Sequence, residues 1–334
     1  MLKITKITDQ KHFIIDSAVS FGIICTLLYF IGIEDILREF SNINYTYLLC
    51  SIVFLILMYF GMTARIYFIL SKLHTKAEND SLINRMKFRD LFKMHMVGML
   101  LADFTPARSG YLAVAYGLTK KYNISEEKSV IAILGPQIYD FTLKVIIGTI
   151  GIFYLINIYL KIQHAELLFL GTIIIACMIA IMIFLLFSKK FLHFFSFAKK
   201  IPVADKILSI LEKAQQNSNV IIHEFPVLFF LLIFGWSMKA ISWFFVAKAL
   251  DITLTIDFPQ VFAYFFLQPI LTTLEFVPSP TLAGLGLSEG GGILVFSIFG
   301  ISAAKAASFI FLARMKTIIV NVFAIKETLS LIRS

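Results

Sequence analysis

Charged side chains that fall inside apolar stretches are the residues of this chain whose types could do chemistry. They are Arg65, Asp103, Arg108, Asp140, Lys144, Lys239, Glu275, Glu289, Lys305, Arg314 and Lys316. Ionisable groups are costly in such stretches and by default functional. An arginine there can bind an anionic group through two parallel hydrogen bonds, and a carboxylate can neutralise it or carry a proton. The pattern favours an anion-binding site, with Asp103, Glu275, Lys239 and Lys305 as candidate charge or proton relays.

A Pro/Gly-rich stretch supplies the second set of candidate binding residues, which are Pro278, Pro280, Gly284, Gly286, Ser288 and Glu289. Backbone amides of a tight turn at a helix start can bind a phosphate. Arg108, two residues before Gly110, or Arg314 could then hold it bidentately. The alternative is that the glycines only allow close helix packing and that Glu289 pairs permanently with Arg314.

Some of these charges also have a purely structural interpretation. Asp140 and Lys144 are spaced i,i+4, so they can neutralise each other on one helix face. Arg65, Lys248 and Lys316 can extend from near a helix end toward a polar surface. Both interpretations stay open at this point.

Composition sets the environment in which these residues must lie. The 334 residues are 59% apolar and 15% charged, with 35 phenylalanines, against about 45–50% and about 25% in soluble domains. This excludes a soluble domain and favours an all-α polytopic membrane protein. The three cysteines show no disulfide or metal spacing, and neither a metal nor a cofactor is expected. The cation excess is explained by membrane topology, so no nucleic-acid partner is expected.

Six segments have the length and apolarity of a transmembrane helix. They are 14–33, 45–70, 129–157, 166–188, 226–248 and 303–325. Two further regions, 88–119 and 258–300, are apolar but broken by Pro, Gly and charge. We expect each to be a re-entrant pair of half-helices, because broken backbone at membrane depth must line protein or a cavity. Two complete spans in each region would satisfy the same topology and give eight or more spans.

The Lys and Arg residues of the connections fall almost entirely on one side of these spans. Of these residues, 21 lie in connections 1–12, 71–93, 106–128, 188–225 and 326–334. Only 2 lie in connections 32–44, 158–166 and 249–258. The positive-inside rule therefore predicts a cell-membrane protein with both termini in the cytoplasm. The connector 188–225 is predicted to be an amphipathic helix on the cytoplasmic leaflet or a plain solvated connector.

The two broken regions resemble each other. Asp103-Phe-Thr-Pro106 matches Glu275-Phe-Val-Pro278 at an offset of 172, and Ile124-Ser125-x-x-Lys128 matches Ile301-Ser302-x-x-Lys305 at an offset of 177. We therefore divide the single transmembrane domain 1–334 into repeat halves 45–157 and 226–325. The charge topology makes these halves inverted, as in many secondary transporters.

The same motifs resemble a known family. Pro106-x-Arg108-x-Gly110 with Asp140 in the next helix, and Pro278-x-Pro280 with Gly284-Leu-Gly286-x-x-Glu289 and the later Arg314, are similar to the signature of the lysylphosphatidylglycerol synthase transmembrane, or flippase-like, family. Tyr111 and Pro136-Gln137 depart from its pattern. The resemblance implies an integral membrane protein that handles an anionic or headgroup-modified lipid, with Asp140 among its substrate-binding residues.

Three functions follow from this resemblance. The first is a flippase-like carrier that moves an anionic phospholipid or a polyprenyl-phosphate-linked lipid between leaflets. The second is a lipid aminoacyl- or glycosyltransferase, which is less favoured because the longest polar segment, 188–225, is too short for a soluble catalytic domain. No catalytic residues are assigned. The third is a non-catalytic membrane partner of a separately encoded transferase. The sequence predicts no oligomeric state.

Overall fold

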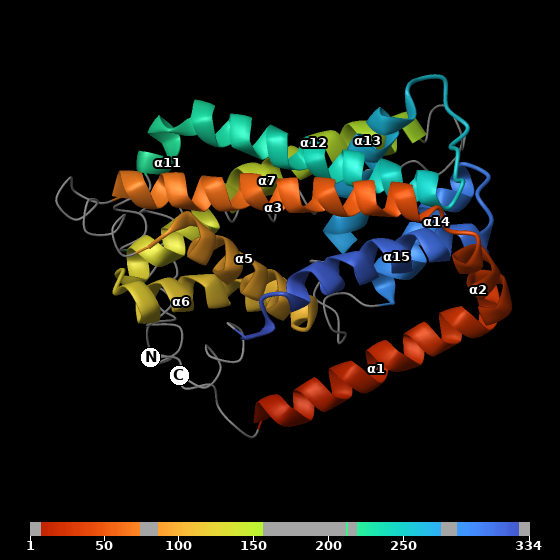
Figure 1. Cartoon of the computed structure of the whole chain (residues 1–334), viewed down its shortest axis with the longest axis horizontal. Helices are drawn as coiled ribbons and strands as arrows, with labels where there is room; N and C mark the ends of the chain where they lie inside the picture. Colours follow the sequence, from red (N-terminus) through yellow and green to blue (C-terminus); the bar gives the residue numbers. More distant parts are fainter. Residues whose placement is uncertain (1–7, 74–85, 156–211, 213–218, 275–285, 327–334) are drawn as a thin grey trace. The chain divides into compact units, whose positions relative to one another are not determined.

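The computed structural model describes residues 8–73, 86–155, 212, 219–274 and 286–326. Within these residues all regular structure is helical (Figure 1). The helices are α1 (Thr8–Ile31), α2 (Ile33–Ser41), α3 (Tyr45–Leu73), α5 (Phe88–Asp103), the 3-10 helix η1 (Pro106–Leu112), α6 (Ala113–Tyr122), α7 (Glu126–Leu155), α11 (Asn219–His223), α12 (Phe225–Ala249), α13 (Gln260–Leu274), α14 (Leu287–Ile298) and α15 (Ala303–Val322).

Helices lie at five of the six predicted spans, namely α1, α3, α7, α12 and α15. The sixth predicted span, 166–188, lies outside the described residues. Of the described helices, α3, α7 and α12 are each long and apolar enough to cross a membrane. The α1–α2 pair passes the same test together, although it bends by 81° at Gly32. The prediction of a helical membrane protein is thus confirmed, and the number of spans stays a prediction.

The backbone of region 88–119 breaks next to Pro106, as the sequence predicts. Helix α5 ends at Asp103 and η1 begins at Pro106, because proline lacks the amide that would continue the helix. Helices α5 and α6 have 16 and 10 residues, fewer than the ~20 that a span needs. In 258–300, α13 and α14 have 15 and 12 residues. Residues 275–285 between them lie outside the described part, including Glu275, Pro278, Pro280 and Gly284.

Element boundaries follow the sequence offsets of the proposed repeat. Helices α5, α6 and α7 follow one another with a break after α5. In the other half, α13, α14 and α15 follow in the same order, with residues 275–285 between α13 and α14. Adding 172 to Asp103, the end of α5, gives 275, one residue after α13 ends. Adding 177 to Glu126, the start of α7, gives 303, the start of α15. The two sets of helices therefore have matching order and spacing.

Two compact units make up the chain. Unit 1 comprises Met1–Ile56, Gly98–Tyr111 and Lys239–Phe323. Its core centres on Phe309 of α15, whose ring lies 5.8 Å from that of Trp243, 5.9 Å from Tyr264 and 4.7 Å from Phe296. These contacts pack α12, α13 and α14 around α15.

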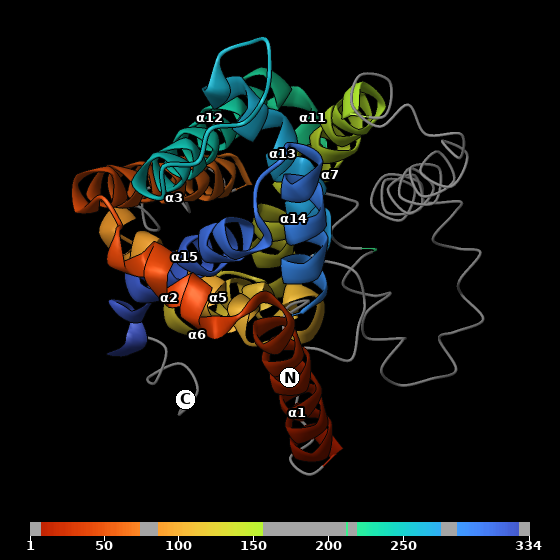
Figure 2. The same ribbon diagram turned by 90° about the vertical axis from the view of Figure 1, so that its right-hand side faces the viewer.

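A short helix in unit 1 occupies part of the predicted connection 32–44. This helix, α2, lies against α15, as both views show (Figures 1 and 2). Gly32, with φ of +92°, permits the sharp turn from α1 into α2. Ile36 is the buried residue of α2, and its remaining residues are half-buried or exposed.

Unit 2 comprises Leu57–Val97, Leu112–Met238 and Ala324–Ser334. Gly61 of α3 allows close approach of the Phe234 ring on α12. Tyr139 of α7 donates a hydrogen bond of 2.8 Å to the Ile221 carbonyl. Of the predicted connector 188–225, the structure describes residue 212 and residues 219–225, which include α11; the rest lies outside the described residues.

Candidate functional site

The break after α5 brings Asp103 and Arg108 together. Arg108 has a left-handed backbone, with φ of +55°, which costs a non-glycine residue about 1–3 kcal/mol. Its Nη2 donates a 3.0 Å hydrogen bond to Oδ1 of Asp103. The two side chains are 14% and 7% exposed, so this is a largely buried ion pair.

Thr105 and Gly110 fix the backbone around Arg108. The Thr105 hydroxyl donates to the Leu101 carbonyl at 3.0 Å and accepts from the Gly110 amide at 2.6 Å. A Cβ atom at position 110 would overlap the Leu101 carbonyl group. Gly110 therefore contributes close backbone packing, and its amide is bonded to Thr105.

Glu289 is held at the start of α14 by three donors. The Gly286 amide and the Ser288 hydroxyl donate to its Oε2 at 2.6 and 2.9 Å, and Arg314 of α15 donates to its Oε1. A carboxylate in the first helical turn is also stabilised by the helix dipole. The amide of Gly286, predicted to bind a phosphate, thus donates to the protein's own carboxylate.

Helix α1 covers the turn that precedes Glu289. Gly286 has φ of +91°, and a Cβ atom there would overlap the side chain of Ile23. Glycine therefore serves two needs at this position, a left-handed backbone and close contact with α1. The side chain of Glu289 is 1% exposed and that of Arg314 is 17% exposed.

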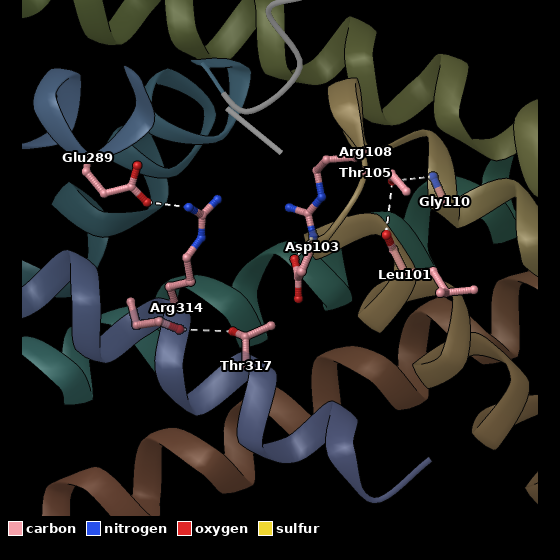
Figure 3. A network of polar contacts seen from close by, with 9 residues as sticks. Leu101, Asp103, Thr105, Arg108, Gly110, Glu289, Arg314 and Thr317 are labelled. Atoms are coloured by element: carbon pink, nitrogen blue, oxygen red, sulfur yellow. Dashed lines mark hydrogen bonds and ion pairs between the residues drawn. The ribbon is translucent and has the colours of Figure 1, made fainter. Parts of the chain in front are cut away.

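The two ion pairs belong to unit 1 and form what we call the charged site, defined as Asp103, Arg108, Glu289 and Arg314. Figure 3 shows the guanidinium groups of Arg108 and Arg314 directed toward each other from η1 and α15. Two arginines and two carboxylates sum to zero net charge. The arrangement offers two forked donors to one anionic group.

Asp140 belongs to unit 2 and has different partners. Its Oδ2 accepts from Lys144 at 2.8 Å, and its Oδ1 accepts from Nε1 of Trp236 at 2.7 Å. The predicted i,i+4 pair is therefore present.

Two predictions that cations extend to a polar surface are wrong. Arg65 is 3% exposed and Lys316 is 2% exposed. Lys316 donates to the carbonyl and hydroxyl of Ser242 on α12, at 3.3 and 2.5 Å. Lys248 lies in the last turn of α12, as predicted. Arg65 and Lys316 are buried by packing against segments distant in the sequence, which a local sequence pattern does not reveal.

The two lysines predicted as relays lie in unit 1 with partners outside the charged site. Lys305 donates to the Asp251 carbonyl at 3.3 Å. It lies nine residues before Arg314 on α15, a rise of about 13 Å. The ammonium of Lys239 lies 5.3 Å from the ring centroid of Trp243. Among the residues described, no cluster of three His, Cys, Asp or Glu side chains forms a candidate metal site.

Thr105, Trp236 and Ser242 were not predicted from the sequence as partners of the buried charges. Trp236 carried a usable signal, since an indole N–H in an apolar helix usually finds an acceptor. Thr105 and Ser242 carried none, because helical hydroxyls commonly bond to their own backbone.

Comparison with known families identifies the chain. The family model described as the lysylphosphatidylglycerol synthase TM region matches residues 13–324. The chain belongs to this family. The match spans nearly the whole chain, so the resemblance of the Pro/Gly motifs is confirmed and the protein is a multi-pass membrane protein of a lipid-related family. No curated protein matches the sequence.

Proposed function

We propose that this protein is a flippase-like transporter that moves an anionic phospholipid or a polyprenyl-phosphate-linked lipid between leaflets. The observation that carries the proposal is the charged site, in which Arg108 and Arg314 are directed toward each other while each is bonded to a carboxylate. Charged groups in membrane helices are expensive and usually functional.

The headgroup phosphate binds between the two arginines. A guanidinium donates two parallel hydrogen bonds to a phosphate, with better geometry than an ammonium offers. Asp103 and Glu289 neutralise the arginines when no headgroup is bound. When the phosphate takes their place, the carboxylates become available to a proton or to a cationic part of the headgroup.

Alternating access follows from the proposed inverted repeat. The matching order of α5, α6 and α7 with α13, α14 and α15 supports duplicated halves 45–157 and 226–325. We propose that both broken regions are re-entrant and that Pro278, Pro280, Gly284 and Glu275 complete the headgroup site. Lys239 and Lys305 are the proposed charge or proton relays.

The lipid is the partner that this proposal requires. The location is the cell membrane, with both termini in the cytoplasm, as the distribution of Lys and Arg favours. A separately encoded lipid-modifying or glycosyl transferase is the second proposed partner, and it would supply or consume the transported lipid.

Translocation in liposomes tests the proposal. Purified full-length chain is reconstituted with a fluorescent anionic phospholipid or a polyprenyl phosphate, and access of the label to an external quencher is followed with time. We expect Arg108→Gln, Arg314→Gln and Glu289→Gln to reduce translocation at least about tenfold, the effect of losing one charge-assisted contact. Arg38→Gln is the matched control, because Arg38 is 74% exposed.

Normal translocation by all three folded variants would overturn the proposal. Formation of an aminoacylated or glycosylated lipid by the purified chain alone would replace it with an enzymatic function.

A further inference from the structure

Arg65 of α3 is a buried cation outside the charged site. It belongs to unit 2 and is 3% exposed. Its Nε atom is buried and has no hydrogen-bond partner among the described residues. No hydrogen bond or ion pair joins its guanidinium to any described side chain, which is rare for a group with five donors.

Two ionisable side chains lie near Arg65, and neither forms an ion pair with it. It lies close enough to His95 and Asp140 to act on both electrostatically. His95 of α5 is fully buried, shares a 2.9 Å hydrogen bond with the Thr63 hydroxyl and packs its ring 5.6 Å from that of Tyr59.

Asp140 is the one acid among the buried charges that the structure describes in unit 2, and both of its oxygens are already bonded. Lys144 holds Oδ2 and Trp236 holds Oδ1. Arg65 and Lys144 against Asp140 leave a surplus of one positive charge in the described interior of this unit. Taking an unpaired charge out of water is strongly unfavourable.

We propose that Arg65 binds an oxyanion, either a free phosphate or the phosphodiester of a lipid, at a second anion site distinct from the charged site. The forked guanidinium fits two oxygens of such a group, and the ligand's charge cancels the surplus in unit 2. Lys144 and Trp236 occupy both oxygens of Asp140, and Arg65 forms no hydrogen bond with it, so the guanidinium fork stays available to the anion.

A structural role for Arg65 makes opposite predictions. If Arg65 served only to neutralise Asp140 at a distance, Arg65→Gln would lower the thermal unfolding midpoint. Added anions would then shift the midpoints of the wild type and of Arg65→Gln equally. If Arg65 binds an oxyanion, Arg65→Gln removes an uncompensated cation. The variant then unfolds at or above the wild-type midpoint in the absence of the anion.

Thermal unfolding of the full chain in nanodiscs tests this in two arms. In the first, inorganic phosphate is titrated at constant ionic strength into nanodiscs of phosphatidylcholine. In the second, phosphatidylglycerol replaces part of the phosphatidylcholine without added phosphate. The lipid arm is run in the Arg108→Gln/Arg314→Gln background, so binding at the charged site does not contribute.

We expect the unfolding midpoint of the wild type to rise and saturate as the anion is added. Arg65→Gln should abolish this rise. Arg65→Lys should lower the apparent affinity for the anion roughly tenfold, since lysine keeps the charge without the forked donors. A response confined to the first arm assigns a free oxyanion, and one confined to the second assigns a lipid headgroup. Equal responses of wild type and Arg65→Gln in both arms, or no response in either, overturn the proposal.

Discussion

Glu289 of the charged site accepts three hydrogen bonds. Both of its oxygens are bonded, and the carboxylate is almost completely buried. A substitution of Arg314 alone therefore leaves a buried negative charge with two neutral donors. Substitution of both Arg314 and Glu289 leaves no charge of this pair buried.

We expect Arg314→Gln to lower the free energy of unfolding by about 3 kcal/mol, the usual cost of removing one partner of a buried ion pair. Arg314→Gln/Glu289→Gln is expected to recover most of that loss, because neither charge remains. The measurement is a double-mutant cycle on unfolding in detergent micelles.

The exposed pair of Arg38 and Asp35 is the control for that cycle. Its atoms are 3.8 Å apart and its side chains are 74% and 57% exposed, so Asp35→Asn should change stability by less than about 1 kcal/mol. Additive losses from Arg314→Gln and Glu289→Gln would contradict the role given to this ion pair.

Local spacing revealed some of these pairs and not others. Asp140 and Lys144 could be paired from the sequence, since i,i+4 residues share a helix face. Asp103 and Arg108 could not, because their contact depends on a left-handed backbone at Arg108 that its residue type disfavours. Lys316 bonds to Ser242 from 74 positions away, and no local pattern encodes such a contact.

Helix ends were more predictable than the connections. Pro106 fixed the end of α5 within three residues, because the steric effect of proline is local. Helix α2 was predicted as a connection, although Ile33, Ile36, Leu37 and Phe40 follow a helical spacing. A pattern of nine residues is too short to predict a helix where the same segment is also charged and polar. Packing against α15 stabilises α2 in the folded protein.

Gly110 tests the geometry of the broken segment. We expect Gly110→Ala to lower the unfolding midpoint and weaken lipid translocation, because its Cβ would overlap the Leu101 carbonyl and displace η1. Gly22→Ala is the matched control. It lies in α1 with no atom within 4 Å of the added Cβ, and alanine stabilises a helix by up to about 1 kcal/mol relative to glycine.

A lower unfolding midpoint for Gly110→Ala together with a higher one for Gly22→Ala would support the assigned packing. Circular dichroism checks that both variants retain their helix content. Unchanged stability in Gly110→Ala would show that the segment can shift without cost.

At the scale of the whole molecule, topology rests on the distribution of cations. The positive-inside rule places Arg38 outside and Lys121 in the cytoplasm. In a background without native cysteines, we expect Arg38→Cys to react with a membrane-impermeant maleimide in intact cells. Lys121→Cys should react only after permeabilisation. The reverse labelling would invert the topology and with it the proposed direction of the repeat halves.

The balance of charge within the charged site has an electrical consequence. Two arginines and two carboxylates that move together through the membrane field do no net electrical work, whereas each uncompensated elementary charge is worth about 2.3 kcal/mol per 100 mV. In the transport cycle proposed above, these four side chains therefore add no voltage dependence of their own. Under the proposed function, transport of a lipid with one net negative charge would be electrogenic, whereas the empty charged site would contribute no voltage dependence to the return step.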